Sequence, residues 1–363
     1  MHYGEIMNKD KDVEIIKQRK RDALNIPLQK EVQYKETTTL LEYVTLIHNA
    51  LPELNLDEID TSTTFLNHKF NAPIIIDSMT GGAEEAREIN SRLAEVAEEY
   101  NIGMGLGSQR AGLLSKELED TYSIAREKAP HAFLIANIGA AQLAKGLSID
   151  DIKSIIDMIK ANALAIHLNP LQELVQPEGE PMFKGVYDKI SEVIRSVNIP
   201  VIVKEVGSGI SKEVAVKLEI INVKAINIAG AGGTSWAGVE RHRAEEAEMD
   251  DNTHLGDLFW DWGIPTAASL LEVKHATNIP IIASGGLRNG LEIAKCLVLG
   301  ADMAALAYPF LKTASQSKDN ASKFAKLLIN ELRSTMFLVG AANINALKNV
   351  RYIIRGELAE WFR

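Results

Sequence analysis

The stretch from Ile281 to Ala307 most constrains what this chain can fold into. An apolar run, Ile281–Ala283, ends at the pair Gly285-Gly286, a helical pattern follows from Leu291 to Leu299, and a second apolar run closes the stretch. This order predicts a strand, a glycine turn, a helix and another strand. Adjacent glycines accept positive φ and let a ligand approach the backbone, and the first N–H groups of a helix attract anions. We therefore expect a phosphate-binding turn here.

Six comparable apolar runs precede this stretch. Each is short, rich in β-branched residues and followed by polar or glycine positions, as expected for strands buried on both faces. The eight predicted strands are Pro73–Asp77, Ile102–Leu106, Ala132–Asn137, Ala163–Leu168, Val201–Lys204, Ala225–Ile228, Ile281–Ala283 and Met303–Ala307. Helical patterns separate most of them, and this alternation predicts parallel pairing in an α/β fold. The number and spacing of the strands favour a (β/α)8 TIM barrel, which often binds phosphate after strands seven and eight.

The simplest domain organisation is one barrel with an N-terminal extension. We assign residues 1–71 to the extension and residues 72–363 to the barrel with its C-terminal helices. A predicted helix from Asp12 to Leu24 carries the basic cluster Lys17–Arg21, a pattern that usually marks a solvated helix face. The mixed segments 40–51 and 57–66 are expected to cover one end of the barrel.

Charge and composition narrow the function classes. A formal net charge of −10 argues against general nucleic-acid binding, so an anionic ligand would need a local basic pocket. The single cysteine, Cys296, excludes an intramolecular disulfide and is expected to be a small buried residue. The absence of a signal-peptide core or a membrane-length apolar run makes the cytoplasm the default location, with no membrane partner.

One connection, from Gly230 to Pro280, is much longer than the others. It contains a glycine-rich start, the charged segment Glu240–Asp251 and the aromatic patch Phe259–Trp262. Long loops in compact domains are usually functional or disordered. We expect the charged segment to be a mobile lid.

The residues that end barrel strands line the catalytic face. Small or hydroxyl-bearing turns follow several of the predicted strands, and this layout fits a phosphorylated planar cofactor. Lys204, at the end of strand five, would lie near the ring, where a positive charge stabilises an anionic reduced flavin. The alternative for Lys204 is a buried ion pair with a neighbouring acid.

The loop His167–Glu173 concentrates an imidazole, two amides and a carboxylate in seven positions. These groups suit hydrogen bonding to a substrate and proton-transfer chemistry. Glu173 suits Mg²⁺, which takes one or two protein carboxylates and fills its other positions with water and phosphate oxygens. Taken singly, His167 is more often a hydrogen-bonded barrel-end residue and Glu173 an ion-pair partner.

Taken together and in order, these residues resemble the type II isopentenyl-diphosphate isomerases. These are FMN-dependent (β/α)8 enzymes that interconvert isopentenyl and dimethylallyl diphosphate. The resemblance runs over most of the chain. It rests on Arg19-Lys20, Met79–Gly82, Gly107–Arg110, Ala136-Asn137, His167–Pro170, Gln172-Glu173, Val203–Glu205, Gly232–Thr234, Ser284–Gly286 and Ala307-Tyr308.

The resemblance implies a role for each of these positions. FMN would be held by Met79, Thr80, Gly81, Ser108, Asn137, Lys204, Thr234, Gly285, Gly286, Arg288, Ala307 and Tyr308. The diphosphate would be held by Arg19, Lys20, Ser108, Gln109 and Arg110, with Gln172 also binding substrate. Glu173 would bind Mg²⁺, and Gln172, His167 and Asn169 would stand around the reacting carbons as catalytic residues. NADPH would reduce the flavin, and the chain would form a homotetramer or a larger homo-oligomer.

Two departures from the family pattern and two rival functions remain. Ala23 stands where the family usually has histidine, and Ala229 where relatives often have serine.

An FMN-dependent oxidoreductase of the 2-hydroxy acid oxidase type shares the barrel, but such enzymes use a histidine beside a glycine pair near strand seven. Here Ser284 precedes that pair and His275 lies upstream. A non-catalytic phosphate-binding scaffold has no evident use for the His167–Glu173 loop.

Overall fold

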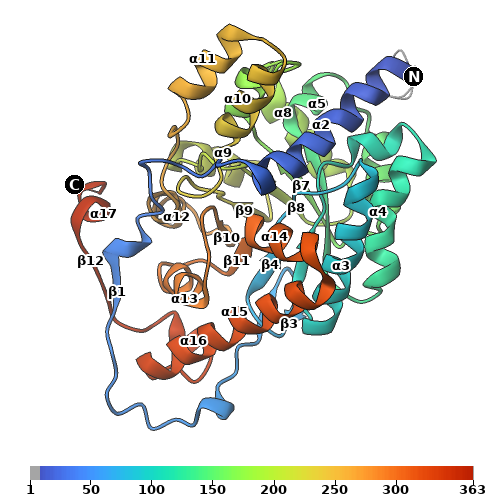
Figure 1. Cartoon of the computed structure of the whole chain (residues 1–363). Helices are drawn as coiled ribbons and strands as arrows, with labels where there is room; N and C mark the ends of the chain where they lie inside the picture. Colours follow the sequence, from blue (N-terminus) through green and yellow to red (C-terminus); the bar gives the residue numbers. More distant parts are fainter. Residues whose placement is uncertain (1–8, 363) are drawn as a thin grey trace.

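Eight parallel strands close into a barrel in the computed structural model, which describes residues 9–362 (Figure 1). Hydrogen-bonded neighbours follow the order β10-β11-β4-β5-β6-β7-β8-β9. The barrel strands are β4 (Ile74–Ile76), β5 (Gly103–Gly105), β6 (Leu134–Gly139), β7 (Ala163–His167), β8 (Val201–Lys204), β9 (Ala225–Asn227), β10 (Ile281–Ser284) and β11 (Met303–Leu306). Each lies within a predicted strand or differs from it by one or two residues, so the predicted (β/α)8 fold is confirmed.

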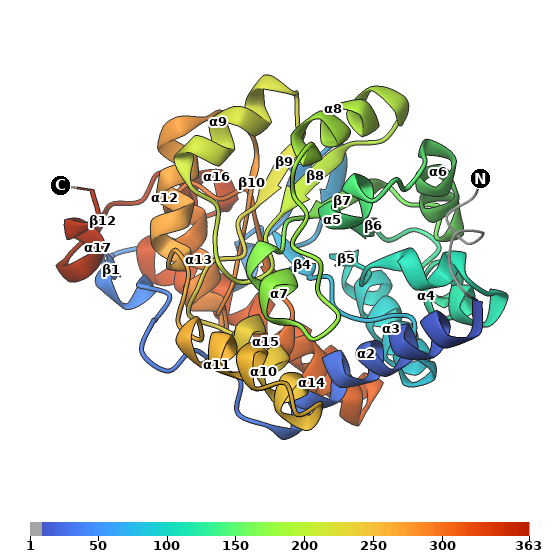
Figure 2. The ribbon, with the colours of Figure 1, turned by 90° about the horizontal axis from the view of Figure 1, so that it is seen from above.

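Helices surround the barrel, as Figure 2 shows from above. They are α3 (Glu84–Tyr100), α4 (Lys116–Lys128), α5 (Ala140–Ala144), α6 (Ile149–Met158), α7 (Pro170–Val175), α8 (Val186–Ser196), α9 (Lys212–Ile220), α10 (Trp236–Glu246), α11 (Asp250–Leu258), α12 (Thr266–Ala276), α13 (Gly290–Val298), α14 (Tyr308–Gln316), α15 (Lys318–Val339), α16 (Ile344–Leu347) and α17 (Gly356–Glu360), with the 3-10 turn η3 (Gln109–Leu113). In the part of the chain described, no helix is long and apolar enough to cross a membrane.

Side chains alternate across each barrel strand between two cores. On β4, Ile75 belongs to the cluster inside the barrel, whereas Ile74 and Ile76 belong to the larger core between strands and helices. Such alternation follows from the period of two in a strand, and each fully buried isoleucine contributes roughly 1.5–3 kcal/mol. Cys296, on α13, is fully buried as predicted, and burial raises the pKa of its thiol.

The N-terminal segment contacts the barrel at both ends. It comprises α2 (Lys9–Gln29), the turns η1 (Leu41–Tyr43) and η2 (Leu56–Glu58), β1 (Val44–Leu46), and the hairpin β2 (Thr63–Phe65) and β3 (His68–Phe70). Phe65 and Phe70 close the barrel floor beside Phe133, which agrees with the predicted cover for 57–66. β1 instead pairs with β12 (Tyr352–Ile354). α2 lies at the opposite end, near α10 (Figure 1).

The predicted lid is folded. Residues 240–251 form the second half of α10 and the start of α11, and Glu240 is buried. Ion pairs within and between these helices account for the order, since Arg241 contacts Glu245 and its Nε lies 3.1 Å from an oxygen of Asp257. The charged segment predicted to be a mobile lid is therefore helical, because ion pairs neutralise its side chains.

Candidate functional site

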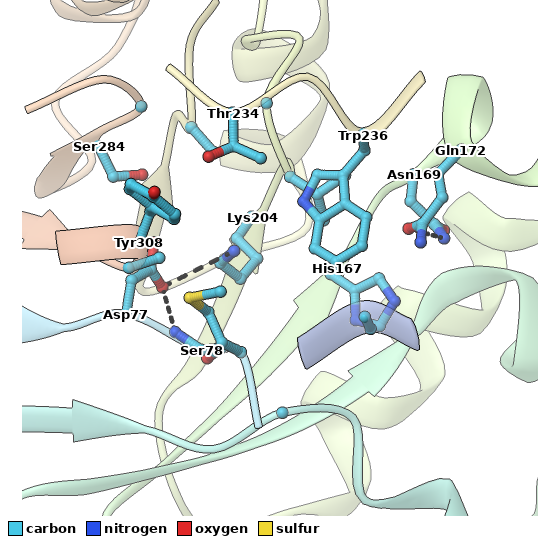
Figure 3. Close-up of a pocket in the computed structure, with 18 of the residues that line it drawn as sticks. Asp77, Ser78, His167, Asn169, Gln172, Lys204, Thr234, Trp236, Ser284 and Tyr308 are labelled. Carbon is cyan, nitrogen blue, oxygen red and sulfur yellow. Dashed lines mark hydrogen bonds and ion pairs between the residues drawn. The ribbon is translucent and has the colours of Figure 1, made fainter. Parts of the chain in front are cut away.

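A cavity opens at the carboxyl ends of the barrel strands. Most of the predicted site residues line it: Arg19, Lys20, Met79, Ser108, Asn137, His167, Asn169, Gln172, Glu173, Lys204, Thr234, Gly285, Gly286, Arg288, Ala307 and Tyr308. Figure 3 shows Asp77, Lys204 and Tyr308 on one side and His167, Asn169 and Gln172 on the other. Residues from all parts of the chain therefore meet where a barrel enzyme has its active site.

Gly230, Gly285 and Gly286 line one side of the cavity, and residues 231–233 pack behind them. Together, residues 230–233 and 285–286 are here called the glycine wall, in which backbone packs on backbone. Gly285 and Gly286 have φ of 97° and 75°. A Cβ on Gly285 would lie 2.0 Å from the carbonyl oxygen of Gly230, and one on Gly233 would lie 2.5 Å from the nitrogen of Gly286. Neither position has room for a side chain, and the exposed peptide groups form a surface that a flat or phosphorylated ligand can approach.

The helix predicted to offer free N–H groups does not do so. At the start of α13, Asn289 accepts a hydrogen bond from the nitrogen of Glu292 at 2.9 Å, and Glu331 accepts one from Gly290 at 2.7 Å. By contrast, α14 follows Ala307 without a side-chain cap. The first turn of α14, after strand eight, therefore fits an anion better than that of α13.

Arg288 adds a positive charge beside this turn. Its guanidinium donates to Gln33 Oε1 at 2.6 Å and to the carbonyl of Leu287, and it lies 5.6 Å from the ring of Tyr308. Burial lowers the pKa of Arg288, although an arginine stays charged. Among the described residues, the hydrogen bonds of this guanidinium go to neutral oxygens, which leaves its charge available for a phosphate.

A buried polar layer lies under the cavity. Lys204 Nζ lies 3.7 Å from Asp77 Oδ1 and donates to the carbonyl of Glu205 at 3.0 Å. Asp77 accepts from Asn227 Nδ2 at 3.2 Å, and Ser284 Oγ donates to Asn227 Oδ1. Lys204 thus both lines the cavity and takes part in the buried ion pair that was its alternative assignment. A lysine held in this way is a fixed positive charge at the cavity floor.

His167 is neutral at physiological pH. Its pKa is lowered to about 3, first by burial and then by repulsion from Lys204, Lys20, Arg19 and Arg110. Nδ1 lies 2.7 Å from Asn137 Oδ1, so the tautomer with a proton on Nδ1 donates to that oxygen. His167 can therefore offer a neutral nitrogen to a ligand, but it is not a cationic acid.

Glu173 sits among amides. One carboxylate oxygen accepts from Asn169 Nδ2 at 3.3 Å, and the other accepts from Gln176 Nε2 at 3.0 Å and from the nitrogen of Glu180 at 3.2 Å. Asn169 Oδ1 is buried and has no hydrogen-bond partner. An unpaired buried acceptor next to a carboxylate fits a cation or a donor group of a ligand. No cluster of three or more potential metal-ligating acids, histidines or cysteines exists among residues 9–362, so a cation here would need further oxygens from outside the protein.

The basic side of the cavity comes from α2. Arg19, Ala23 and Pro27 recur every four residues on the helix face that lines the cavity, and Lys20 is adjacent. Lys20 Nζ donates to the carbonyl of Ser108 at 3.0 Å. Burial, Arg19 and Arg110 lower the pKa of Lys20 well below its usual value. This crowding of cations is unfavourable without a ligand, and a polyanion would relieve it.

Four predicted residues lie behind the cavity wall instead of in it. Thr80 is buried against Asn90, and a Cβ on Gly81 would lie 1.9 Å from Tyr122. Gln109 accepts from the nitrogen of Asn137 at 3.1 Å and donates to the carbonyl of Ile155, so it supports strand β6. Arg110 is buried in η3 and acts on the cavity through its charge.

Residues outside the predicted site set also line the cavity. Trp236 and Glu240 come from α10, one turn apart, and Ala229, at the site of a family serine, lines the wall with φ of 37°. Glu240 accepts from Gln172 Nε2 at 2.8 Å, and burial raises its pKa although Arg243 opposes the shift. The four-residue spacing of 236 and 240 was the available signal, but the charges that follow favoured a mobile lid.

Comparisons with known proteins identify the family of this chain. The family model described as FMN-dependent dehydrogenase matches residues 157–353. Proteins named isopentenyl-diphosphate delta-isomerase from Nostoc sp. and Methanothermobacter thermautotrophicus are 47% and 45% identical, covering 91% and 96% of this chain and 94% and 96% of their own lengths. A lactate oxidase structure from Pediococcus acidilactici is 15% identical, with a TM-score of 0.66 over 95% of this chain and 94% of its own. That likeness shows the fold alone.

Proposed function

This chain belongs to the isopentenyl-diphosphate delta-isomerase family, and on that premise we propose that it interconverts isopentenyl diphosphate and dimethylallyl diphosphate at the barrel mouth. The observation that carries the proposal is the pairing of two unlike walls in one cavity. A glycine wall suited to FMN faces Arg19 and Lys20, which suit a diphosphate.

The residues of the cavity fit FMN. The glycine wall excludes side chains, the first turn of α14 has no side-chain cap, and the guanidinium of Arg288 is available for a phosphate. We assign the cofactor to Met79, Ser108, Asn137, Lys204, Thr234, Gly285, Gly286, Arg288, Ala307 and Tyr308. Thr80 and Gly81 would act from behind this wall. Reduced FMN, when bound, would supply the acid and base for moving the double bond, and NADPH would serve as its reductant.

The protein's own groups would bind and orient the substrate. Arg19 and Lys20 would anchor the diphosphate, with Arg110 adding charge from η3 and Ser108 and Gln109 shaping the adjacent turn. Glu173 would hold Mg²⁺, with substrate oxygens and water completing its coordination. Anchoring the diphosphate fixes the position of the isoprenyl carbons and so lowers the entropic part of the barrier.

Near the reacting carbons we place His167, Asn169 and Gln172. His167 would act as a neutral hydrogen-bonding group, because its low pKa rules out a protonated imidazole at neutral pH. Gln172 is oriented by Glu240, and Asn169 Nδ2 donates to Gln172 Oε1 at 3.1 Å. This network would hold the substrate carbons in place and exclude bulk water. Lys204, fixed by Asp77, would favour an anionic reduced flavin.

Little favours the oxidase alternative. The structural likeness to 2-hydroxy acid oxidases comes at 14–16% identity and supports only the shared barrel. Ser284, before the glycine pair, donates to Asn227 and so is occupied within the polar layer. Among the described residues lining the cavity, His167 is the one histidine, and it lies on β7 across the barrel from that pair.

The test is an anaerobic assay with FMN, NADPH, Mg²⁺ and isopentenyl diphosphate. We expect a yellow protein that makes dimethylallyl diphosphate with many turnovers per NADPH, because the reaction has no net redox change. Stoichiometric consumption of NADPH, or no product, contradicts the proposal. An EDTA-treated sample tests the Mg²⁺ requirement in the same assay.

The proposal also covers the domain organisation, the oligomeric state and the location of the protein. Residues 1–71 would form an extension that supplies Arg19 and Lys20 to the barrel of residues 72–363, although the first eight residues lie outside the described part of the chain. The family resemblance supports a homotetramer or larger homo-oligomer and a cytoplasmic location, without a nucleic-acid or membrane partner. Sedimentation velocity of the purified protein measures its oligomeric state.

A further inference from the structure

Arg243, on α10, connects three segments that meet around the cavity. Its side chain is only 9% exposed. Nε donates to Asp22 Oδ2 at 3.1 Å, Nη2 to Glu178 Oε1 at 2.9 Å and Nη1 to Glu240 Oε2 at 2.7 Å. These three carboxylates belong to α2, to the loop after α7 and to α10 itself. One guanidinium therefore joins parts of the chain more than 200 residues apart in sequence.

Two of these carboxylates also contact a residue that lines the cavity, and the third lies on the helix that carries Arg19 and Lys20. Asp22 lies on α2, two positions after Lys20. Glu178 Oε1 lies 3.9 Å from Arg19 Nε, which is a loose ion pair. Glu240 accepts a hydrogen bond from Gln172. Arg243 is not among the residues that line the cavity, but it holds the partners of Arg19 and Gln172 and pairs with α2, the helix that carries Lys20.

The charge balance explains why Arg243 is needed. Burial alone would lower its pKa, but Glu240 and Glu178 outweigh that effect and raise it. Without the Arg243 guanidinium, Asp22, Glu178 and Glu240 would be left close together and short of cationic partners. Glu178 would then hold Arg19 more tightly, and the repulsion between Asp22 and the other two acids would push α2 away from α10.

We propose that Arg243 is a positioning residue that docks α2 on the barrel and keeps Arg19 free for an anionic ligand. Glu178, held by Arg243, keeps the Arg19 guanidinium in place at 3.9 Å but releases it when a diphosphate arrives. The ligand chemistry in this proposal rests on the proposed function, whereas the docking of α2 does not. The two parts are therefore measured separately.

Docking is measured by limited trypsin digestion of the full chain. The cluster Lys17–Arg21 on α2 supplies the cleavage sites, and the size of the N-terminal fragment identifies them. In Arg243→Met, which keeps a long side chain without the charge, we expect cleavage in α2 to accelerate on the order of tenfold or more, because a buried charge network is broken. Arg243→Lys should give an intermediate cleavage rate. The lysine ammonium keeps the charge, but it lacks the planar set of donors with which the guanidinium contacts three carboxylates.

Two further variants keep the test decisive if Arg243→Met folds poorly. Asp22→Asn removes only the α2 arm of the network and should also accelerate cleavage. Glu85→Gln is the matched control. Glu85, on α3, forms an exposed ion pair at 3.6 Å with Arg21, which lies on α2 next to Asp22. Its cleavage rate should equal that of the unmodified protein. Equal rates in Asp22→Asn, Arg243→Met and Glu85→Gln overturn the docking.

Ligand capture is measured by calorimetry with inorganic pyrophosphate and Mg²⁺, and by steady-state kinetics. We expect Asp22→Asn to weaken pyrophosphate binding and raise KM for isopentenyl diphosphate by roughly tenfold, with kcat changing much less, because anchoring is lost and chemistry is not. A fall in kcat at unchanged KM and unchanged pyrophosphate affinity contradicts the positioning role. If the unmodified protein does not isomerise the substrate, the proposed function fails, while digestion and pyrophosphate binding still decide the role of Arg243.

Discussion

The two walls of the cavity are held together by different kinds of interaction. The glycine wall, residues 230–233 and 285–286, is backbone against backbone, with contacts that leave no space for a Cβ. The opposite side, here called the ionic wall, consists of side chains from α2, α7 and α10 held by ion pairs and amide hydrogen bonds. The first is rigid because two glycine turns with fixed backbone conformations pack directly on each other, and the second depends on the attraction between charged side chains. The two walls should therefore fail in different ways.

The largest effect is expected in the glycine wall. Gly285→Ala introduces a Cβ 2.0 Å from the Gly230 carbonyl at a position with φ of 97°. We expect a loss of roughly 2–4 kcal/mol of unfolding free energy, from backbone strain plus overpacking, and a loss of FMN binding. Chemical denaturation and flavin retention on gel filtration measure the two effects.

Gly146→Ala separates strain from steric clash. Gly146 has φ of 99°, nearly the same as Gly285, but a Cβ there would meet nothing within 4 Å. Gly146→Ala should lower the free energy of unfolding by only about 1 kcal/mol, because alanine disfavours a positive φ, and it should leave FMN binding intact. Equal losses in the two variants would mean that backbone conformation alone, and not the packing of the two loops, makes the glycine wall.

In the ionic wall the largest single effect is expected at Glu173. Glu173→Gln keeps the size of the side chain but removes the charge that would hold Mg²⁺. We expect kcat/KM to fall on the order of a hundredfold and the Mg²⁺ concentration for half-maximal activity to rise, while FMN binding stays unchanged. An assay across Mg²⁺ concentrations measures both effects.

The neighbouring carboxylate Glu180 provides the control for Glu173. Its side chain is more than half exposed and pairs with Lys145, and only its backbone nitrogen contacts Glu173. Glu180→Gln should leave the Mg²⁺ dependence as it is. If Glu173→Gln keeps full activity at low Mg²⁺, the metal assignment is wrong and Glu173 is simply a hydrogen-bond acceptor for Asn169 and Gln176.

The fold and the turn at Gly285-Gly286 could be predicted from sequence because their causes are local. A β-branched run predicts a buried strand, and Gly285-Gly286 predicts a turn with positive φ, whatever lies elsewhere in the chain. The capping of α13 by Glu331 could not be predicted in this way, since Glu331 lies on α15. The pairing of β1 with β12 depends likewise on residues some 300 positions apart.

The ionic wall was only partly predictable for the same reason. His167, Gln172 and Glu173 lie within seven positions and were predicted together, whereas Glu240 and Arg243 fall in the charged segment that was predicted to be a mobile lid. Their burial depends on Asp22 and Glu178, and no local pattern reports that the four will meet. Arg110 is a different case, because this motif residue is buried in η3 outside the cavity lining, and its assignment to the substrate stays a prediction.

The smallest predicted effect is a pH dependence that the ionic wall should have and the glycine wall should lack. Burial, Arg19 and Arg110 lower the pKa of Lys20, so part of its charge is lost at a pH where lysine is normally protonated. A bound diphosphate favours the charged form and raises that pKa again. Binding therefore takes up a proton, and affinity should fall as pH rises through the lowered pKa, by at most about tenfold per pH unit.

Pyrophosphate titrations across this pH range measure the effect, with Lys20→Arg as the matched variant. Arginine keeps its proton, so the variant should bind pyrophosphate with a flatter pH profile, and the ionisation of pyrophosphate itself cancels in the comparison. FMN binding should have the same pH profile in both proteins, because Lys20 is not among the residues assigned to FMN. Parallel pyrophosphate profiles would show that Lys20 stays fully charged in the free protein, and that the ionic wall already contains enough negative charge to keep its cations protonated before any ligand arrives.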